Sequence, residues 1–117
     1  QMDELSENAK RASNFLKALA NENRLIILCC LAEGERNVGE LETMLGIRQP
    51  SLSQQLARLR SDGLVETRRD SKQVYYRLTS EEAEKMIGLL YEMFCAGEQA
   101  NAKYDSDQKR NLDVVSK

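Results

Sequence analysis

The sequence predicts a mainly α-helical fold that carries one small β-hairpin, and three observations support this class. Apolar residues recur at helical spacing through residues 2–62. Gly46 and Pro50 then divide residues 37–62 into two short helices, because glycine ends helices and proline suits their first turn. After Gly63 the pattern changes to short runs rich in strand formers. The order of elements predicts a winged helix-turn-helix with helical arms at both ends.

Length and composition are those of a small domain in water. The chain has 117 residues, of which 41% are hydrophobic, and a mean hydropathy of −0.58, so much of each helix must face water. No apolar run is long enough to span a bilayer, and residues 1–10 lack the features of a signal peptide. We therefore expect a cytoplasmic protein without a membrane partner. We expect one domain over residues 2–97 and a polar, disordered tail over residues 98–117.

The first two helices are expected to differ in burial. Residues 2–20 carry an apolar stripe that needs a partner, either the rest of the domain or another subunit. The stripe consists of Leu5, Ala9, Ala12, Leu16 and Leu19. Asn21 is placed to cap a second helix from Glu22 to about Glu33, which Gly34 ends. Residues 25–32 are apolar nearly all round, so we expect the second helix to be the most buried element.

Residues 37–62 carry the signals of two short helices joined by a tight turn. Asn37 and Glu40 have the spacing of a capping box, and Gly46 is placed to end the first helix. Pro50 suits the first turn of the second helix. Its buried stripe is expected to be Leu52, Leu56 and Leu59. This arrangement is typical of a helix-turn-helix.

The other face of that second helix carries hydroxyls, amides and a guanidinium but no carboxylate. Its residues are Gln49, Ser51, Ser53, Gln54, Gln55 and Arg58. Amides and arginine have the donors and acceptors that match base edges in a major groove. The alternative is an ordinary helical hairpin with a solvated face, but such a face normally mixes Glu with Lys. We therefore predict that this helix reads double-stranded DNA.

Residues 64–69 and 73–78 predict two strands joined by the polar residues 70–72. A hairpin directly after a recognition helix is a wing, and Arg68, Arg69 and Lys72 are placed to contact phosphates or a minor groove. The alternative is an edge hairpin whose charges only prevent aggregation. The charge distribution favours DNA: residues 47–77 hold seven basic and three acidic residues, a net charge of +4, whereas the remainder carries −6.

The last helix is expected from a capping box at Thr79 and Glu82 to about Ala96. Its apolar face consists of Ala83, Met86, Ile87, Leu90, Met93 and Phe94. Together with the first helix it carries more apolar surface than one small domain needs. A symmetric homodimer would bury this surface and place two recognition helices about one DNA turn apart, on an inverted repeat.

Four segments resemble the ArsR/SmtB family of bacterial repressors. They are ALANENRL at residues 18–25, VGEL at 38–41, QPSLSQQL at 49–56 and LRSDGLV at 59–65. The resemblance covers roughly residues 2–96. It implies a homodimer that represses by occupying operator DNA and leaves when an inducer binds or reacts.

The known metal sites of that family are not matched here. Metal-sensing members carry a cysteine motif on the helix before the recognition helix, or an Asp/His set on the last helix. Residues 37–42 read NVGELE without a thiol, and the chain has no histidine. Carboxylates and thiols alone are a poor match to the common ligand sets of zinc, nickel and cobalt. We expect neither a metal nor a cofactor.

Two cysteines resemble those of another branch of the family. RLIILC at residues 24–29 and LYEMFC at 90–95 are similar to the dithiol branch, which includes the SqrR-like and BigR-like repressors that respond to sulfide or are associated with biofilms. The resemblance implies that Cys29 and Cys95 react with persulfides and become joined by an intramolecular sulfur bridge, which relieves repression. Cys30 does not match that pattern and points about 100° from Cys29 on a helix. We interpret Cys30 as a buried hydrophobe. The alternative to a reactive pair is that Cys29 and Cys95 are ordinary buried residues as well.

Two other functions remain open at this stage. Three thiolates are chemically suited to arsenite, so the inducer is alternatively arsenite or a general oxidant. A thiol-active enzyme is a further alternative, but it would need a Cys-x-x-Cys at a helix start, and the chain has only the adjacent pair Cys29 and Cys30 in an apolar helix. The chain also lacks a glycine-rich phosphate loop and a histidine base. We therefore predict that it is not an enzyme.

Overall fold

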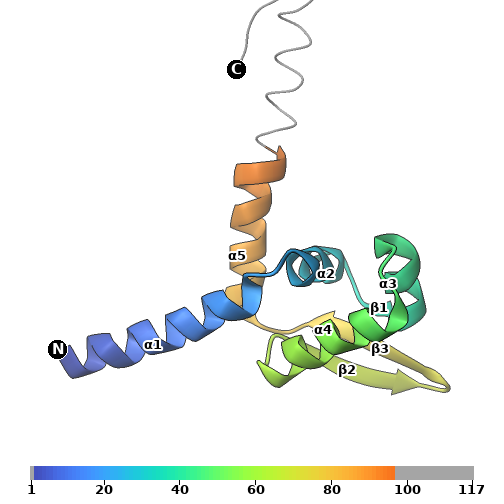
Figure 1. Ribbon diagram of the computed structural model, residues 1–117, viewed down its shortest axis with the longest axis horizontal. Coiled ribbons are helices and arrows are strands. Elements are labelled where there is room, and N and C mark those ends of the chain that lie inside the picture. Colours follow the sequence, from blue (N-terminus) through green and yellow to red (C-terminus); the bar gives the residue numbers. More distant parts are fainter. Residues whose placement is uncertain (1, 97–117) are drawn as a thin grey trace, which may run out of the picture. The chain divides into compact units, whose positions relative to one another are not determined.

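A computed structural model describes residues 2–96, which form helices and a three-stranded antiparallel sheet (Figure 1). The helices are α1 (Met2–Leu19), α2 (Glu22–Ala32), α3 (Val38–Leu45), α4 (Gln49–Ser61) and α5 (Glu81–Tyr91), which continues as the π-helix η1 (Glu92–Ala96). The strands are β1 (Arg36–Asn37), β2 (Val65–Asp70) and β3 (Gln73–Leu78). The described residues fall into two compact units, residues 2–84 and residues 85–96. The predicted tail, residues 98–117, lies outside the described residues.

The first unit has its core where α2, α3 and α4 pack together. Its fully buried side chains are Ile27, Leu28, Leu41, Leu52, Leu56 and Leu59. The helix-turn-helix is built as the sequence predicts. The amide of Glu40 donates to Asn37 Oδ1 at 2.7 Å and the amide of Asn37 donates to Glu40 Oε1 at 2.9 Å, which completes the capping box. Gly46 ends α3 in the left-handed region, with φ of 68°.

Helix α2 is buried on one side only. The side chain of Asn21 caps it by accepting from the amide of Arg24 at 3.0 Å, as predicted. Ile27, Leu28 and Leu31 are buried, but Ile26 and Cys29 are exposed. The expectation of burial nearly all round is therefore wrong for one face. An apolar run cannot reveal which side of a helix its neighbours leave uncovered.

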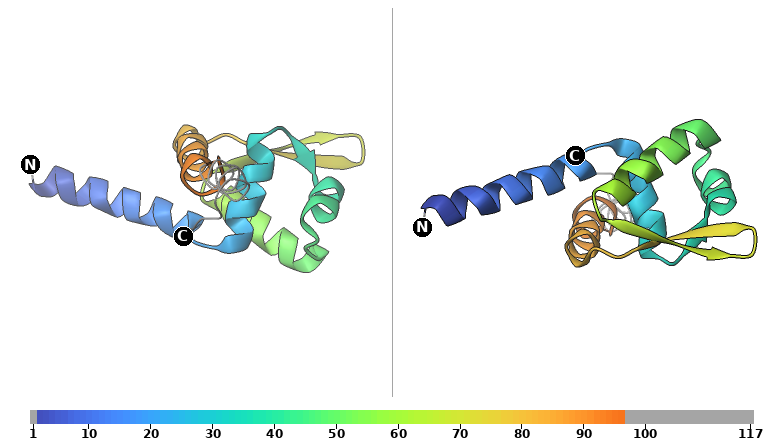
Figure 2. Two further views of the ribbon diagram at one scale, coloured as in Figure 1. Left: turned by 90° about the horizontal axis from the view of Figure 1, so that it is seen from above. Right: turned by 90° about the horizontal axis from the view of Figure 1, so that it is seen from below.

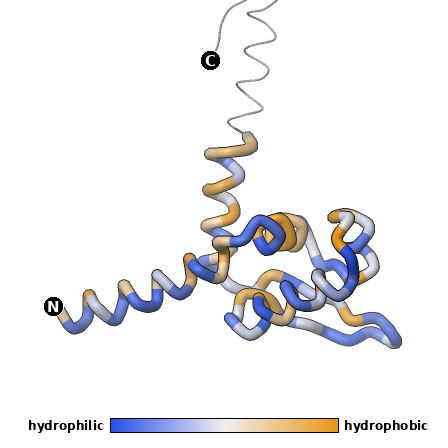
Figure 3. The backbone as a smooth tube through the Cα atoms, viewed as in Figure 1, coloured by the Kyte–Doolittle hydropathy of each residue, from blue (hydrophilic) through white to orange (hydrophobic). Residues whose placement is uncertain are grey.

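The wing is the hairpin of β2 and β3, with Asp70 paired to Gln73 across a two-residue turn. Ser71 in that turn has a φ of 60°, in the left-handed region. The two-residue strand β1, which the sequence did not predict, pairs with β3 on the side away from β2, so the sheet order is β1-β3-β2. The wing is made mostly of hydrophilic residues, whereas α2 is largely hydrophobic (Figure 3). Because β1 pairs with β3, the sheet joins the wing to the chain segment that leads into α3.

Helix α1 extends away from the rest of the first unit (Figures 1 and 2). Only Ala18 and Leu19 of this helix are buried, and Leu5 and Leu16 are 60% and 52% exposed. The apolar stripe predicted for this helix is thus uncovered over most of its length. Its last turn is held by Arg24, a buried residue that donates from Nε to the carbonyl of Ala18 at 2.6 Å and from Nη2 to that of Lys17 at 3.2 Å.

The start of α5 differs by one residue from the prediction. Ser80, not Thr79, caps the helix, because Ser80 Oγ accepts from the amide of Ala83 at 3.0 Å. The amide of Thr79 donates instead to the carbonyl of Leu64 at 3.0 Å, which closes the base of the hairpin. Thr79 therefore still belongs to the hairpin. Of the predicted apolar face, Ala83 and Ile87 are buried, whereas Met93 and Phe94 are exposed. Among residues 2–96, no helix has the length and apolar character needed to cross a membrane.

Candidate nucleic-acid interface and cysteines

The outer face of α4 carries the residues predicted to read bases. Gln49, Ser53, Gln54 and Arg58 are exposed, and Ser51 and Gln55 are half-buried. Ser53 Oγ donates to Gln49 Oε1 at 3.1 Å, one helical turn away. The Gln54 side chain has no hydrogen-bond partner within the described part of the chain, so both groups of its amide are available. An amide in this state can pair with the two acceptor and donor positions of an adenine edge.

Gln55 and Arg58 already have partners inside the protein. Gln55 Oε1 accepts from Arg24 Nη1 at 3.0 Å, so a recognition-helix side chain is joined to the residue that holds α1. Burial lowers the pKa of the Arg24 guanidinium, with a further lowering by Arg58 and an opposite effect of Asp62. Arg58 Nε donates to Asp62 Oδ2 at 2.7 Å. Both contacts lie toward the C-terminal half of α4.

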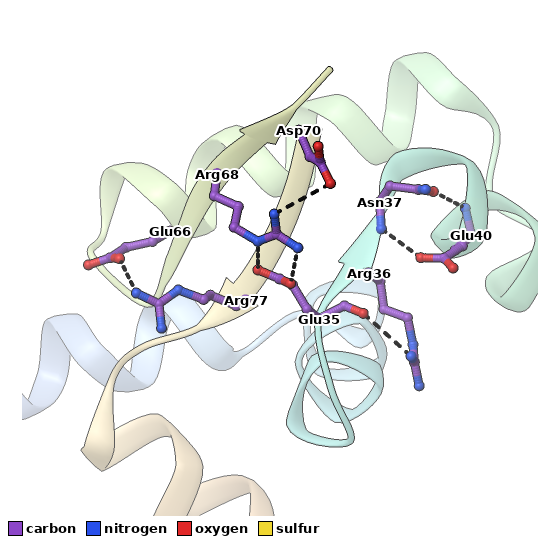
Figure 4. A network of polar contacts seen from close by, with 8 residues as sticks. All are labelled: Glu35, Arg36, Asn37, Glu40, Glu66, Arg68, Asp70 and Arg77. Carbon is purple, nitrogen blue, oxygen red and sulfur yellow. Dashed lines mark hydrogen bonds and ion pairs between the residues drawn. The ribbon is translucent and has the colours of Figure 1, made fainter. Parts of the chain in front are cut away.

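The wing cations fall into two groups. Arg69 and Lys72 are exposed and, within residues 2–96, neither is in an ion pair. Arg68 instead donates from Nε and Nη2 to the two carboxylate oxygens of Glu35, each at 2.8 Å (Figure 4). Its guanidinium also lies over the ring of Tyr75, 4.8 Å from the centroid. Arg68, which the sequence predicts to contact DNA, therefore binds the carboxylate of Glu35 in the same chain. The sequence did not predict this contact.

Glu35 is the residue that sequence reasoning missed. The hydrogen bonds from Arg68, and then its charge and that of Arg77, hold the pKa of Glu35 below its ordinary value. The same contact raises the pKa of Arg68. Glu35 and Arg68 are 33 positions apart in the chain, and nothing local in the sequence marks them as partners. Only the sheet, through the unpredicted strand β1, brings them together.

The three cysteines have different surroundings. Cys29 on α2 and Cys95 on η1 are exposed, and Cys30 is half-buried; none of the three is in a disulfide. Burial raises the pKa of the Cys30 thiol, as does the charge of Glu33, against a smaller lowering by Arg36. Cys30 is therefore a poorer source of thiolate at neutral pH. Its partial exposure fits the interpretation of Cys30 as core filler only in part.

The described residues hold no obvious metal site: in the range 2–96, no group of three or more Cys, Asp or Glu side chains is placed to bind a metal ion.

The features that the structure does combine are a helix-turn-helix with a polar outer helix face, a basic wing and a buried apolar core. They define a winged helix-turn-helix DNA-binding protein.

Comparison with known proteins places the chain in a family within this class. The profile of "Bacterial regulatory protein, arsR family" matches residues 21–67. A biofilm growth-associated repressor of Xylella fastidiosa is 48% identical over 97 residues, 83% of this chain and 85% of the relative. The transcriptional activator HlyU of Vibrio cholerae is 47% identical over 98 residues, 84% of this chain and 91% of the relative. The chain belongs to the arsR family of transcriptional regulators.

A solved structure supports the same conclusion. The structure of reduced HlyU from Vibrio cholerae superimposes with a TM-score of 0.76 at 49% identity, covering 79% of this chain and 97% of that one. The resemblance to the ArsR/SmtB family is thereby confirmed, as is the winged-helix fold. These relatives are described as regulators of transcription rather than as enzymes, which agrees with the prediction for this chain.

Proposed function

We propose that the chain is a homodimeric transcriptional repressor that binds an inverted-repeat operator and is released when Cys29 and Cys95 react with a persulfide. The observation that carries this proposal is the pair of exposed thiols, one on α2 and one on η1, in a chain whose third cysteine is half-buried with a raised pKa. The polar face of α4 supplies the base contacts, and Arg69 and Lys72 supply phosphate contacts from the wing.

The uncovered apolar residues support a dimer. Leu5 and Leu16 lie on one face of α1 and are more than half exposed, and Met93 and Phe94 of the second unit are 53% and 63% exposed. An apolar helix stripe that is left uncovered in this way is typical of a surface that binds another protein. A second copy covers the same residues on both chains by symmetry, and a two-fold axis matches an inverted repeat.

The proposed direction of regulation, repression, needs an argument beyond family membership. Proteins of nearly equal identity to this chain are named a repressor in Xylella fastidiosa and an activator in Vibrio cholerae. A protein that occupies an operator within a promoter acts most simply by keeping RNA polymerase from that DNA. In-vitro transcription from a promoter that carries the operator is expected to fall when the protein is added. A rise in transcript would contradict the repressor assignment.

The release chemistry balances with a persulfide as the only reagent. The Cys29 thiolate attacks the outer sulfur of R–S–SH, which forms Cys29–S–SH and releases R–SH. The Cys95 thiolate then attacks the inner sulfur of this persulfide, which forms a Cys29–S–S–Cys95 bond and releases H₂S. The two cysteine sulfurs are oxidised and the outer sulfur is reduced to sulfide. A second persulfide equivalent that reacts with Cys95 before closure leaves one additional sulfur in the bridge.

Exposure favours Cys29 as the reacting thiol on α2, and the raised pKa of Cys30 counts against that neighbour. Attack requires a thiolate that the reagent can reach. Cys29 is exposed, whereas Cys30 is half-buried and its pKa is raised. A bridge that ties α2 to η1 then changes the relative stability of two dimer arrangements. A few kcal/mol is enough to move most of the population from the DNA-bound form.

Operator binding is tested with a duplex that the wild-type protein selects from a random library, compared with a scrambled duplex. Gln54→Ala is expected to weaken binding to the selected duplex and not to the scrambled one. Lys72→Ala is expected to weaken both and to reduce the slope of log affinity against log salt by about 0.9 for each of the two protomers. Equal losses on both duplexes for Gln54→Ala would show that this amide does not read bases.

Dimer formation is tested by sedimentation of variants in α1. Leu5→Gln combined with Leu16→Gln is expected to raise the dimer dissociation constant at least about tenfold, because it replaces two apolar side chains that the second copy would bury. Lys10→Gln is the matched control on an exposed, polar position of the same helix. A wild-type dissociation constant for the double leucine variant would remove α1 from the interface.

Release is tested by treating the protein–DNA complex with an organic persulfide, hydrogen peroxide, zinc or arsenite in parallel. Cys29→Ser and Cys95→Ser are expected to bind DNA normally and to resist release by persulfide, whereas Cys30→Ser responds as wild type. Mass spectrometry separates bridge formation from arsenite binding, because a direct disulfide only removes two hydrogens, each additional bridging sulfur adds the mass of one sulfur, and arsenite leaves a bound metalloid. Normal release of the Cys95→Ser protein would contradict the two-thiol mechanism.

A further inference from the structure

The contact between Glu35 and Arg68 spans the sheet. Arg68 lies on β2, at one edge, and Glu35 directly precedes β1, at the other edge. The Arg68 side chain crosses β3 above Tyr75, its cross-strand partner, and ends in two parallel hydrogen bonds to the carboxylate (Figure 4). A bidentate pair fixes direction as well as distance. The contact therefore constrains how the outer strand of the wing lies relative to β1.

The β1 end of this contact belongs to the helix-turn-helix. Asn37 of β1 pairs with Tyr75 and is also the residue that caps α3. Glu35 is thus two residues from the start of the helix-turn-helix, on a segment whose backbone is fixed by strand pairing and by the capping box. A carboxylate held at this point is a fixed anchor for a long side chain that comes from the wing.

The contact also occupies Arg68. Its Nε and Nη2 donate to Glu35, and its Nη1 lies 3.9 Å from Asp70 Oδ2. Arg69 lies on β2 next to the hairpin turn and Lys72 lies in that turn, and neither has such a partner in the described range. A phosphate would have to displace a carboxylate from Arg68, whereas the other two cations are available at once.

We propose that Glu35 and Arg68 are positioning residues of the wing, and that the wing contacts DNA phosphates through Arg69 and Lys72. The pair holds the hairpin at the angle to α3 and α4 at which both cations reach the backbone of the same duplex. This proposal rests on the DNA-binding role proposed above. It assigns Glu35, an acidic residue that contacts the basic wing, a role that favours DNA binding.

The sheet contains a matched control for this proposal. Arg77 Nη2 donates to Glu66 Oε1 at 2.9 Å, and these residues are cross-strand partners within the hairpin. Glu66→Gln and Glu35→Gln each remove one negative charge and one arginine pair from the same sheet. Only the Glu35 pair connects the wing to the segment that leads into α3. Differences between the two variants therefore report positioning and not charge.

Affinity for the selected duplex provides the first measurement. Glu35→Gln is expected to bind at least about threefold more weakly than wild type, with an unchanged salt slope, whereas Glu66→Gln binds as tightly as wild type or more tightly. Arg68→Lys keeps the charge and loses the fork, so it is expected to bind as weakly as Arg68→Ala. Tighter binding by Glu35→Gln with a steeper salt slope would show that Arg68 is itself a phosphate ligand and would overturn the proposal.

Backbone order parameters of the protein without DNA provide the second measurement. Values at Ser71 and Lys72 are expected to fall in Glu35→Gln and to stay at the wild-type level in Glu66→Gln. Unchanged values in Glu35→Gln would overturn the positioning role. Loss of the DNA effects of Gln54→Ala and Lys72→Ala would instead contradict the proposed function, and the order parameters of the unbound protein would still decide the role of Glu35.

Discussion

The helix-turn-helix and the wing both belong to the candidate DNA surface, but different forces hold them. Leu52, Leu56 and Leu59 of α4 are all fully buried. The polar pairs of the wing, Glu35 with Arg68 and Glu66 with Arg77, have side chains between 27% and 59% exposed. Apolar burial is insensitive to salt and to acid, whereas exposed ion pairs weaken with both. The position of α4 is therefore fixed under all conditions in which the protein is folded, and that of the wing is adjustable.

The largest effect is expected in the helix-turn-helix. Leu56→Ala removes a fully buried side chain and is expected to lower the free energy of unfolding by about 2–5 kcal/mol. Urea denaturation monitored by circular dichroism measures the loss. Ala57→Gly, at an exposed position of the same helix, is the control and is expected to cost about 1 kcal/mol. A loss below that of the control would mean that α4 is not held by its leucine stripe.

A polar contact of the helix-turn-helix comes next. Arg24→Met keeps the length of the side chain but removes the donor from the buried carbonyl of Ala18 and from the amide oxygen of Gln55, while the carbonyl of Lys17 still accepts from the amide of Ala20 at 3.3 Å. Unsatisfied buried acceptors destabilise, and the expected loss is about 1–3 kcal/mol in the same denaturation experiment. Hydrogen exchange is expected to rise in the last turn of α1. Arg11→Met, an exposed arginine of α1, is the control and is expected to show no change.

The two regions also differ in how much of them the sequence predicts. The capping box of Asn37 with Glu40, the end at Gly46 and the burial of the α4 leucines are all predicted, because each depends on residues at most four positions apart. The anchor of the wing is not predicted, because Glu35 reaches Arg68 only through strand pairing of a two-residue strand. The shift of the α5 cap to Ser80 has a similar cause, since the hairpin takes the amide of Thr79. The partners of Arg24 likewise come from two other helices.

A smaller effect of opposite sign is expected at the tip of the wing. Ser71 has a φ of 60° and Gly46, in the helix-turn-helix, a φ of 68°, so the same left-handed conformation is occupied by serine in one region and glycine in the other. Ser71→Gly relieves the strain of a Cβ atom in the left-handed region, but glycine loses more conformational entropy on folding, which offsets part of this gain. The expected net stabilisation is about 0.5 kcal/mol. Denaturation measures the gain. Lys72→Gly is the control, because Lys72 does not have a positive φ, and it is expected to destabilise.

The smallest effect is a dependence of the wing on acid. The pKa of Glu35 is held below its ordinary value of 4.5, chiefly by the hydrogen bonds from Arg68. A lowered carboxyl pKa means that the contact contributes fully above about pH 4.5 and is lost as the pH falls through the lowered value. Order parameters at Ser71 are therefore expected to be lower in acid below the lowered pKa than at pH 5, while those of α4 stay constant over the range in which the protein remains folded.

Glu35→Gln provides the control for this titration, because an amide does not titrate. In this variant the tip of the wing is expected to have equally low order parameters at both pH values. Glu66→Gln is expected to retain the wild-type response, since the Glu35 contact is intact in that variant. If the order parameters of α4 and the wing fell together in acid, the buried leucines would not make α4 less sensitive to acid than the wing. The proposed difference between the two regions would then be wrong. If the tip stayed ordered while the Glu35 carboxyl became protonated, strand pairing alone would fix the wing.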